Sequence, residues 1–350
     1  MIRPMIASRA IHAKSAKENP LMGDKVCRPA ILSGLIALLL AVLPAAGAEP
    51  VGVVTILDGN VTTIRGLSRF SLAEGVRIMS NDLVETGNGA FARIEFSDGV
   101  IVDLGPATRA QLNRPSLRNN DRPALYLLTG WIKISAGKLG EGAKAAVATP
   151  QFDAVGLDAE SVERIEAGSG SAFAEGGSLR ALDHRGRVRA PVLLRSGDFL
   201  ALNNGEAPKI LGRPTPQFLA YLPREFQDRL PARIARFKER EVPAKSLGTF
   251  TYVEVEPWLD AEPSIRRRFV SEWAAKATDD IAFREALDAG LSRHPEWERL
   301  LHPERFEPDP LEPAATTKSA PAGGSSSNKS DSVSRSTVLG HDAPQGARAQ

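Results

Sequence analysis

Alternating apolar and polar residues fill the stretch Val51–Leu104, which reads VGVVTILDGNVTTIRGLSRFSLAEGVRIMSNDLVETGNGAFARIEFSDGVIVDL. The alternation is interrupted by Asp58-Gly59, Asn88-Gly89 and Asp98-Gly99, dipeptides that favour the positive φ angles of tight hairpin turns. A period of two between such turns is typical of short antiparallel strands with one buried face. The stretch therefore predicts an all-β domain.

Strand-like segments continue well beyond this stretch, separated by polar or glycine-rich turns such as Gly137–Gly142, Gly168–Gly170 and Gly176-Gly177. Many short strands at close spacing predict a sandwich, a barrel or a β-solenoid, which we assign to residues 49–212. The further candidates are Ala124–Leu128, Trp131–Ser135, Ala145–Thr149, Phe152–Val155, Glu160–Glu166, Ser171–Ala174, Leu179–Asp183, Pro191–Leu194 and Phe199–Leu202.

The pattern changes after this domain. Residues 213–256 carry apolar residues at intervals of mostly four, but Pro223 and Pro231 cut that pattern into short helices. Thr249–Val255 alternates again and predicts one more strand. We expect a mixed connector of short helices and a strand.

Residues 257–305 give the clearest helical pattern. Pro263 begins a helix, and Asp279 or Asp280 caps the next one. From 306 to 350 the chain consists mostly of small and polar residues, which predicts a disordered tail. The apolar face of the first helix would carry residues four positions apart: Ile265, Phe269, Trp273 and Ala277.

Residues 1–48 have the organisation of a secretory signal peptide. Lys25 and Arg28 precede the 13-residue apolar run Ile31–Leu43, and Ala46-Gly47-Ala48 supplies small residues for cleavage before Glu49. A run of this length is shorter than the ~20 residues of a membrane span, so we expect no stable span after cleavage. An uncleaved anchor and a buried helix are the alternatives, and Met22 is a second candidate start. The leader predicts a periplasmic protein.

Composition narrows the function further. Without the six basic and two acidic residues of 1–48, 38 basic and 40 acidic residues remain, a net charge of −2. A nearly neutral chain argues against nucleic acid as a partner. The one cysteine, Cys27, lies in the leader, so the mature chain would have neither disulfides nor thiolate chemistry.

Four segments of the β region carry a recognisable motif. Val51–Val61 is similar to the opening G-x-V-x-x-x-x-G-x-V of FecR-type domains, and Leu83–Gly99 to their hallmark V-x-T-G-x-G-A-x-A-x-I-x-F-x-D-G. Gly130–Ile134 and Thr149-Pro150 resemble a later strand and the turn after it. The resemblance implies an all-β fold of sandwich or solenoid character. It also implies a non-enzymatic role in periplasmic sensing or protein interaction, best known in signalling from outer-membrane iron–siderophore receptors to a sigma factor.

The sequence departs from the iron-signalling regulators in two ways. At most 28 residues precede the apolar run, too few for the N-terminal anti-sigma domain of those regulators, and the helical region 257–305 has no counterpart in them. We therefore expect a stand-alone exported FecR-like protein without the anti-sigma domain.

The reactive side chains predict no catalytic site, no cofactor site and no metal site. Asp58 and Asp98 precede glycine and so favour turn roles, and Asp103 shows no partner for glycoside hydrolysis. Gly168-Ser169-Gly170-Ser171 lacks the G-x-S-x-G pattern of a nucleophile elbow. The histidines His12, His184, His294, His302 and His341 lack metal-ligand spacing, although a His/Glu site using Glu296 or Glu304 beside His294 or His302 is conceivable.

Two basic clusters form a possible interaction surface. Charge that protects a sheet edge from strand pairing is one interpretation, and contact with an anionic envelope polymer or an acidic protein is the other. The clusters are Arg114, Arg118 and Arg122, and Arg185, Arg187 and Arg189.

These observations favour an exported, non-catalytic FecR-domain protein that acts as a periplasmic binding or scaffold module. Its partner would be a protein or an envelope polymer, and the sequence does not fix the oligomeric state. An envelope sensor that regulates a sigma factor through a partner is the alternative, and an enzyme acting on cell-wall polymer is a third hypothesis.

Overall fold

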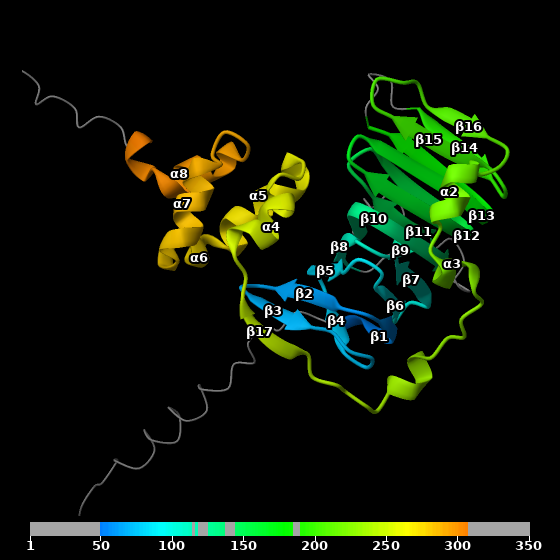
Figure 1. Ribbon diagram of the computed structural model, residues 1–350, viewed down its shortest axis with the longest axis horizontal. Helices are drawn as coiled ribbons and strands as arrows, with labels where there is room; N and C mark the ends of the chain where they lie inside the picture. The colour runs from blue at the N-terminus through cyan, green and yellow to red at the C-terminus, as the bar shows by residue number, and fades with distance from the viewer. Residues whose placement is uncertain (1–49, 114–115, 118–124, 137–143, 185–189, 307–350) are drawn as a thin grey trace, which may run out of the picture. The chain divides into compact units, whose positions relative to one another are not determined.

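The computed structural model describes residues 50–113, 116–117, 125–136, 144–184 and 190–306 (Figure 1). The leader Met1–Ala48 lies outside these residues, as does the tail after residue 306. Up to Leu301 the described residues form one compact unit, and the 3₁₀ turn η3 (Pro303–Arg305) belongs to a second. No helix among the described residues combines the length and the apolar character of a membrane span.

The predicted mainly β fold is confirmed. All strands join one hydrogen-bonded sheet, which folds back on itself. The strands are β1 (Pro50–Asp58), β2 (Val61–Arg65), β3 (Ser68–Ser71), β4 (Arg77–Met79), β5 (Asp82–Thr86), β6 (Phe91–Phe96), β7 (Val100–Leu104), β8 (Arg109–Leu112), β9 (Ser116–Leu117), β10 (Leu125–Ala136), β11 (Lys144–Ala148), β12 (Phe152–Glu166), β13 (Ser169–Asp183), β14 (Pro191–Arg195), β15 (Phe199–Asn203), β16 (Lys209–Leu211) and β17 (Lys245–Thr249).

Three long strands, β10, β12 and β13, each pass from one layer of the fold into the other. The second half of β10 pairs with β7 and β12, whereas its first half pairs with β8 and, in parallel, β11. Layer A, as we call it, begins with the ladder β1–β6–β7. It continues through the second half of β10, the second half of β12 and the first half of β13, and it ends with the whole of β15 and β16. Layer B contains β3, β2, β5, β8, β11, β14 and the remaining halves of the long strands.

The main hydrophobic core lies between the two layers. Ile94, Ile132 and Ala172 contribute from layer A, and Val84 and Val147 from layer B. The fold therefore has the two-layered character of a sandwich, but the layers are joined by continuous strands rather than only by loops.

Two glycines of positive φ lie inside these long strands, one between two strands predicted as separate and one in a predicted turn. Gly130 has a φ of 95° within β10, and Gly177 a φ of 67° within β13. The predicted turn at Gly176-Gly177 is therefore wrong, because the chain bends there without leaving the sheet. Positive φ is accessible to glycine and lets a strand change direction while its ladder continues on both sides.

The helices are α2 (Pro216–Tyr221), α3 (Arg224–Gln227), α4 (Tyr252–Leu259), α5 (Pro263–Glu272), α6 (Ala274–Asp279), α7 (Ile281–Ala289) and α8 (Glu298–Leu301), with the 3₁₀ turns η1 (Ile234–Phe237) and η2 (Pro295–Trp297). Pro263 begins α5 and Asp280 caps α7, as predicted, its carboxylate accepting from the amide of Phe283. The single helix predicted through Ala277 is interrupted at Trp273, which has φ −111° and ψ 12°.

The strand predicted over Thr249–Val255 is also corrected. Only Thr249 belongs to a strand, because Thr251 and Glu254 form a capping box that starts α4 one residue later. In the capping box the backbone amides are hydrogen-bonded to the side chains of Thr251 and Glu254, whereas in a strand they would pair with an adjacent strand.

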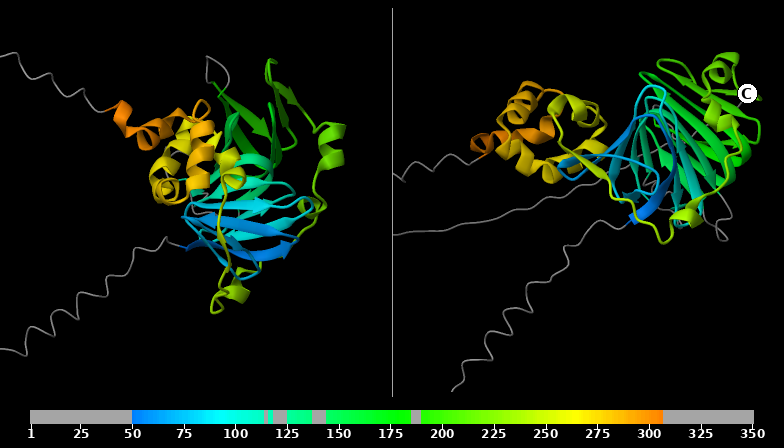
Figure 2. Two further views of the ribbon diagram at one scale, coloured as in Figure 1. Left: turned by 60° about the vertical axis from the view of Figure 1, so that its left-hand side comes forward. Right: turned by 60° about the horizontal axis from the view of Figure 1, so that its bottom comes forward.

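The helices α4–α8 pack on the outer face of layer B, and α2 and α3 pack on the outer face of layer A (Figures 1 and 2). A second hydrophobic cluster joins Trp258, Trp273 and Trp297 of the helices to Leu83 and Tyr126 of layer B. A third cluster joins α2 and α3 to layer A. We call residues 213–242, which include α2, α3 and η1, the strap.

Candidate functional site

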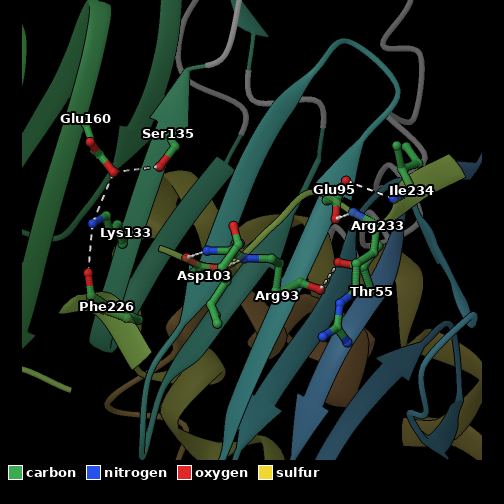
Figure 3. A network of polar contacts seen from close by, with 11 residues as sticks. Thr55, Arg93, Glu95, Asp103, Lys133, Ser135, Glu160, Phe226, Arg233 and Ile234 are labelled. Carbon is green, nitrogen blue, oxygen red and sulfur yellow. Dashed lines mark hydrogen bonds and ion pairs between the residues drawn. The ribbon is translucent and has the colours of Figure 1, made fainter. Parts of the chain in front are cut away.

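The outer face of layer A carries a row of charged side chains that is covered by the strap. Arg93 and Glu95 project from β6, Asp103 from β7 and Lys133 from β10 (Figure 3). Their registers place Arg93 opposite Asp103 and Asp103 opposite Lys133. All four are buried. Charges on an open sheet face would be solvated, so their burial shows that the strap belongs to the structure of this face.

Asp103 is held by two parallel contacts. Arg93 donates from Nε to Oδ1 and from Nη2 to Oδ2, each at 2.7 Å. Burial raises the pKa of Asp103 above its ordinary value, and the Arg93 guanidinium opposes that shift. This carboxylate, a candidate for glycoside hydrolysis from the sequence, is thus bound to an arginine within the sheet.

The same charged side chains bind the backbone of the strap. Arg93 donates from Nη1 to the carbonyl oxygen of Leu230 at 2.7 Å. The two Glu95 oxygens accept from the amides of Arg233 and Ile234, at 2.6 and 3.0 Å (Figure 3). Because these contacts use main-chain atoms, they fix the path of the strap with little dependence on its side chains.

Lys133 completes this attachment. Its Nζ lies 2.8 Å from the carbonyl oxygen of Phe226, and 3.1 and 2.7 Å from carboxylate oxygens of Glu160 and Glu175. The ammonium is buried, whereas both carboxylates are partly exposed. The positive charge of Lys133 is therefore balanced by two carboxylates, Glu160 and Glu175, that remain accessible to solvent.

Aromatic side chains seat α2 and α3 on the sheet. The Phe218 ring lies 4.8 Å from that of Phe199 and 5.2 Å from that of Trp131, between ring centroids. Phe226 meets Phe91 edge to face at 6.4 Å. These contacts bury Phe91, Trp131 and Phe199 on the outer face of layer A.

A pocket of about 220 Å³ remains open beside α2, over β12, β13 and β15. Its floor is formed by Phe199, Phe218 and Ala201. Its walls are polar: the hydroxyls of Ser169, Ser171 and Thr215, the amides of Asn203 and Gln217, and the charged pair Arg164 and Glu166. The pocket therefore offers several hydrogen-bonding groups above an apolar surface.

Arg164 has a fixed position at this pocket. Its guanidinium carbon lies 4.6 Å from the ring centroid of Trp131 and 5.3 Å from that of Tyr221, and its Nη2 pairs with Glu166. Its Nε is buried without a hydrogen-bond partner in the described part of the chain. Two rings and a carboxylate thus hold the cation, and one donor stays unsatisfied.

The six arginines predicted as an interaction surface lie outside the described residues: Arg114, Arg118, Arg122, Arg185, Arg187 and Arg189. Asp98 lies in the turn after β6, before Gly99 of positive φ, and accepts from the amide of Val100, so its turn interpretation is confirmed. Asp58 is instead the last residue of β1 and pairs with Phe91, and the turn begins at Gly59, whose φ is positive.

The histidines are dispersed. His184 pairs with Asp153 at 3.2 Å and His302 with Glu304 at 3.2 Å, while His294 is fully buried in the helical region with a pKa lowered by that burial. Across the described ranges, no three His, Cys, Asp or Glu side chains lie close enough together to hold a metal ion. His12 and His341 fall outside those ranges.

Sequence reasoning did not identify the pocket or the strap. Arg164 and Glu166 alternate along one strand, and Ser169 and Ser171 along the next, with the Gly168 turn between them. That pattern places all four side chains on one face. It does not reveal that α2 forms a wall above them.

A family model described as FecR protein matches residues 82–193, from the start of β5 into β14. The match confirms the predicted FecR resemblance over the hallmark Leu83–Gly99 and the two later motifs, and begins after the opening motif Val51–Val61. It includes Arg93, Asp103, Lys133 and Arg164 but ends before the strap. No curated protein matches the chain.

Solved structures similar to this chain include two crystal structures, at 1.65 and 2.50 Å resolution, described as a "putative anti-sigma factor" from Parabacteroides distasonis. Each is 16% identical over 39% of this chain, with TM-scores of 0.33 and 0.34. The alignments cover 63% and 62% of those chains, so this chain spans less than two thirds of their length.

Proposed function

We propose that this chain, with its FecR match over residues 82–193, is an exported, non-catalytic binding or scaffold module of the periplasm. The observation that carries the proposal is the open polar pocket beside α2, formed on a face whose charged groups are already bound to the strap. A pocket of hydroxyls and amides above aromatic rings is suited to holding a ligand.

The chemistry of the pocket favours binding over catalysis. Acid–base cleavage of a glycosidic bond uses two carboxyl groups about 5–9.5 Å apart. Among the described lining residues the pocket has one carboxylate, Glu166, and that group is paired with Arg164. Asp103, the other carboxylate considered, is bound to Arg93.

Export is the second part of the proposal. The signal-like pattern of residues 1–48 supports delivery to the periplasm with cleavage between Ala48 and Glu49. The net charge of −2 that remains supports a protein or an envelope polymer as the partner rather than nucleic acid. The boundaries proposed from the sequence, with a β domain over 49–212 followed by a connector and a helical region, are part of the same hypothesis.

Sedimentation with purified envelope material tests the binding role. Tagged mature protein should pellet with the envelope, and Ser171→Leu, which places a larger apolar side chain in the pocket, should leave most of it in the supernatant. Ser178→Leu is the matched control because Ser178 lies on the same strand outside the pocket. Equal pelleting of all three proteins, or a precursor that stays in the cytosol with its leader attached, would contradict the proposal.

An envelope sensor acting on a sigma factor through a partner is the second candidate, favoured by the FecR match itself. Deletion of the gene should then change the transcripts of envelope-stress or iron-uptake genes. Unchanged transcripts would reject the sensor and leave the binding module.

The two arginine clusters predicted from the sequence remain a second candidate contact surface. Reversal of all six arginines to glutamate should weaken pelleting at low salt more than at high salt, because surface charge is screened by ions. Pelleting that is unchanged at low salt would assign these clusters to edge protection alone.

A further inference from the structure

We propose that the pocket beside α2 binds a single neutral pyranose ring of an envelope polysaccharide. The inference rests on the binding role proposed above and names the ligand of that site. Four properties of the pocket support it: its size, its hydrogen-bonding groups, its apolar floor and its balanced charge.

The size of the pocket limits the ligand. Its volume is about 220 Å³, below the ~300–1,000 Å³ of pockets that enclose drug-sized molecules. One six-membered sugar ring is of that scale, whereas an aromatic cofactor or a nucleotide is larger. A polymer could place one ring here and continue on both sides, since the pocket opens to solvent beside the exposed face of α2.

The polar groups suit hydroxyls. A sugar hydroxyl both donates and accepts, and side-chain hydroxyls and amides do the same. Ser169, Ser171 and Gln217 make no side-chain hydrogen bond to other described residues, so they are available to a ligand. The buried Nε of Arg164 adds a donor that lacks a partner. A buried donor without a partner costs free energy, which a ligand oxygen would recover.

The apolar floor of the pocket suits the C–H face of a sugar ring. Phe199 of β15 and Phe218 of α2 pack edge to face at 4.8 Å, and Ala201 lies two residues after Phe199 on β15, opposite Ser171 of β13. The C–H faces of a pyranose are apolar and gain by leaving water for such a surface. Seating the ring would therefore combine an apolar contact below with hydrogen bonds at its edge.

The charge balance argues against an anion. The Arg164 guanidinium already pairs with Glu166, and the two rings of Trp131 and Tyr221 hold it in place. A phosphate or carboxylate would meet the Glu166 charge as well as the arginine. A neutral ring meets no such repulsion.

The position of the pocket argues against an extended peptide. Peptides that add to a sheet pair with an open edge strand through main-chain hydrogen bonds. The pocket lies over the paired strands β12, β13 and β15, whose backbone groups bind one another. A stem peptide is thus an outcome of the test and not the proposal.

Titration of the mature full chain with defined probes tests the assignment. The probes are maltotriose, the trimer of N-acetylglucosamine, trigalacturonate and a tetra-alanine peptide, followed by calorimetry and by ligand-observed NMR. We expect binding of at least one neutral trisaccharide. Ser171→Leu should weaken it at least about tenfold, the loss of roughly one good contact, and Gln217→Ala should weaken it by a smaller factor. Ser178→Leu should bind as the wild type does.

Several results would overturn the inference: no binding of either neutral trisaccharide, preference for trigalacturonate, binding of the peptide alone, or equal affinity in Ser171→Leu with its fold intact. Gln217 is exposed on α2, so Gln217→Ala keeps the test valid if Ser171→Leu fails to fold. Envelope pelleting that depends on Ser171 without any saccharide binding would leave the binding module standing and reject only the sugar.

Discussion

Lys133 Nζ in β10 donates to the main-chain carbonyl oxygen of Phe226, 93 residues later in the chain, at 2.8 Å. The contact ties layer A to the strap and shows why a lysine lies buried on a sheet face. Two further charged residues, Arg93 and Glu95, make contacts of the same kind to the strap backbone. The face thus binds an extended stretch of its own chain through side chains, and this attachment makes the strap one wall of the pocket.

Replacement of Lys133 by methionine should loosen the strap. The Phe226 carbonyl would lose its donor, while Glu160 and Glu175 are exposed enough to be solvated. We expect a loss of about 1–3 kcal/mol in the free energy of unfolding, measured by urea denaturation. Trypsin should also cut faster after Arg224 and Arg229 in the strap.

Lys209→Met is the control for this change. Lys209 pairs with Glu206 at 2.7 Å but is mostly exposed, and surface ion pairs contribute little to stability. Lys209→Met removes one tryptic site of its own, but the rate of cleavage after Arg224 and Arg229 should match that of the wild type. A Lys133→Met protein that is digested no faster than this control would show that the strap is held by its aromatic residues alone.

The pair Arg93 and Asp103 should show strong coupling. Asp103→Leu alone leaves the Arg93 guanidinium buried without its carboxylate, which typically costs about 3–5 kcal/mol. Adding Arg93→Met removes the unpaired charge and should recover a large part of that loss, although the Leu230 carbonyl then lacks its donor. A double-mutant cycle by chemical denaturation measures the coupling; losses that simply add would contradict a bound pair.

Gly130 should tolerate no side chain. It has a φ of 95°, and a Cβ there would lie 2.4 Å from the Cα of Thr108 and 2.8 Å from the carbonyl oxygen of Ala107. We expect Gly130→Ala to cost at least about 3 kcal/mol in thermal or urea unfolding, since the new Cβ would meet backbone atoms of the turn before β8 as well as require a positive φ. Gly66→Ala is the control, with a positive φ but open space around it, and should cost about 1 kcal/mol. Similar losses in the two variants would show that φ alone matters.

The sequence allowed prediction of most strands because their alternation is local. It could not show where β10 and β13 continue through a bend, because glycine favours a turn and a bent strand for the same reason, namely its access to positive φ. Gly176-Gly177 was accordingly predicted as a turn, and Gly130 fell between the predicted strands Ala124–Leu128 and Trp131–Ser135. The distinction depends on which strands pair on either side, and that is a property of the whole sheet.

The sequence also allowed prediction of which side chains share a face of β6, but not of whether each face is buried or exposed. Alternation separates Ala92 and Ile94 from Arg93 and Glu95, and charged residues ordinarily face solvent. Here the charged face is buried, because the strap that covers it comes more than 100 residues later. The pocket was missed for the same reason, since half of its lining comes from β12 and β13 and the rest from β15 and α2.

Glu163 gives a pH-dependent prediction. It lies in β12 between Ile132 and Ala172 of the neighbouring strands, is fully buried, and forms no ion pair with another described residue. Burial raises the pKa of Glu163 to about 8. Between the ordinary glutamate pKa of ~4.3 and 8 the folded chain therefore holds a proton that the unfolded chain has released.

This difference fixes the sign of the effect. Because the unfolded state binds fewer protons in that window, the free energy of unfolding should be highest below about pH 4.3 for this group and fall by up to ~1.4 kcal/mol per pH unit until pH 8. Glu163→Gln cannot ionise, so the variant should lose this slope and gain stability over the wild type as pH rises. Thermal unfolding of both proteins at pH 5.5 and pH 8 measures the difference between them, which cancels the titration of all other groups. A difference that is the same at both pH values would show that the proton on Glu163 makes no contribution in this range and that its carboxylate is already ionised in the folded core.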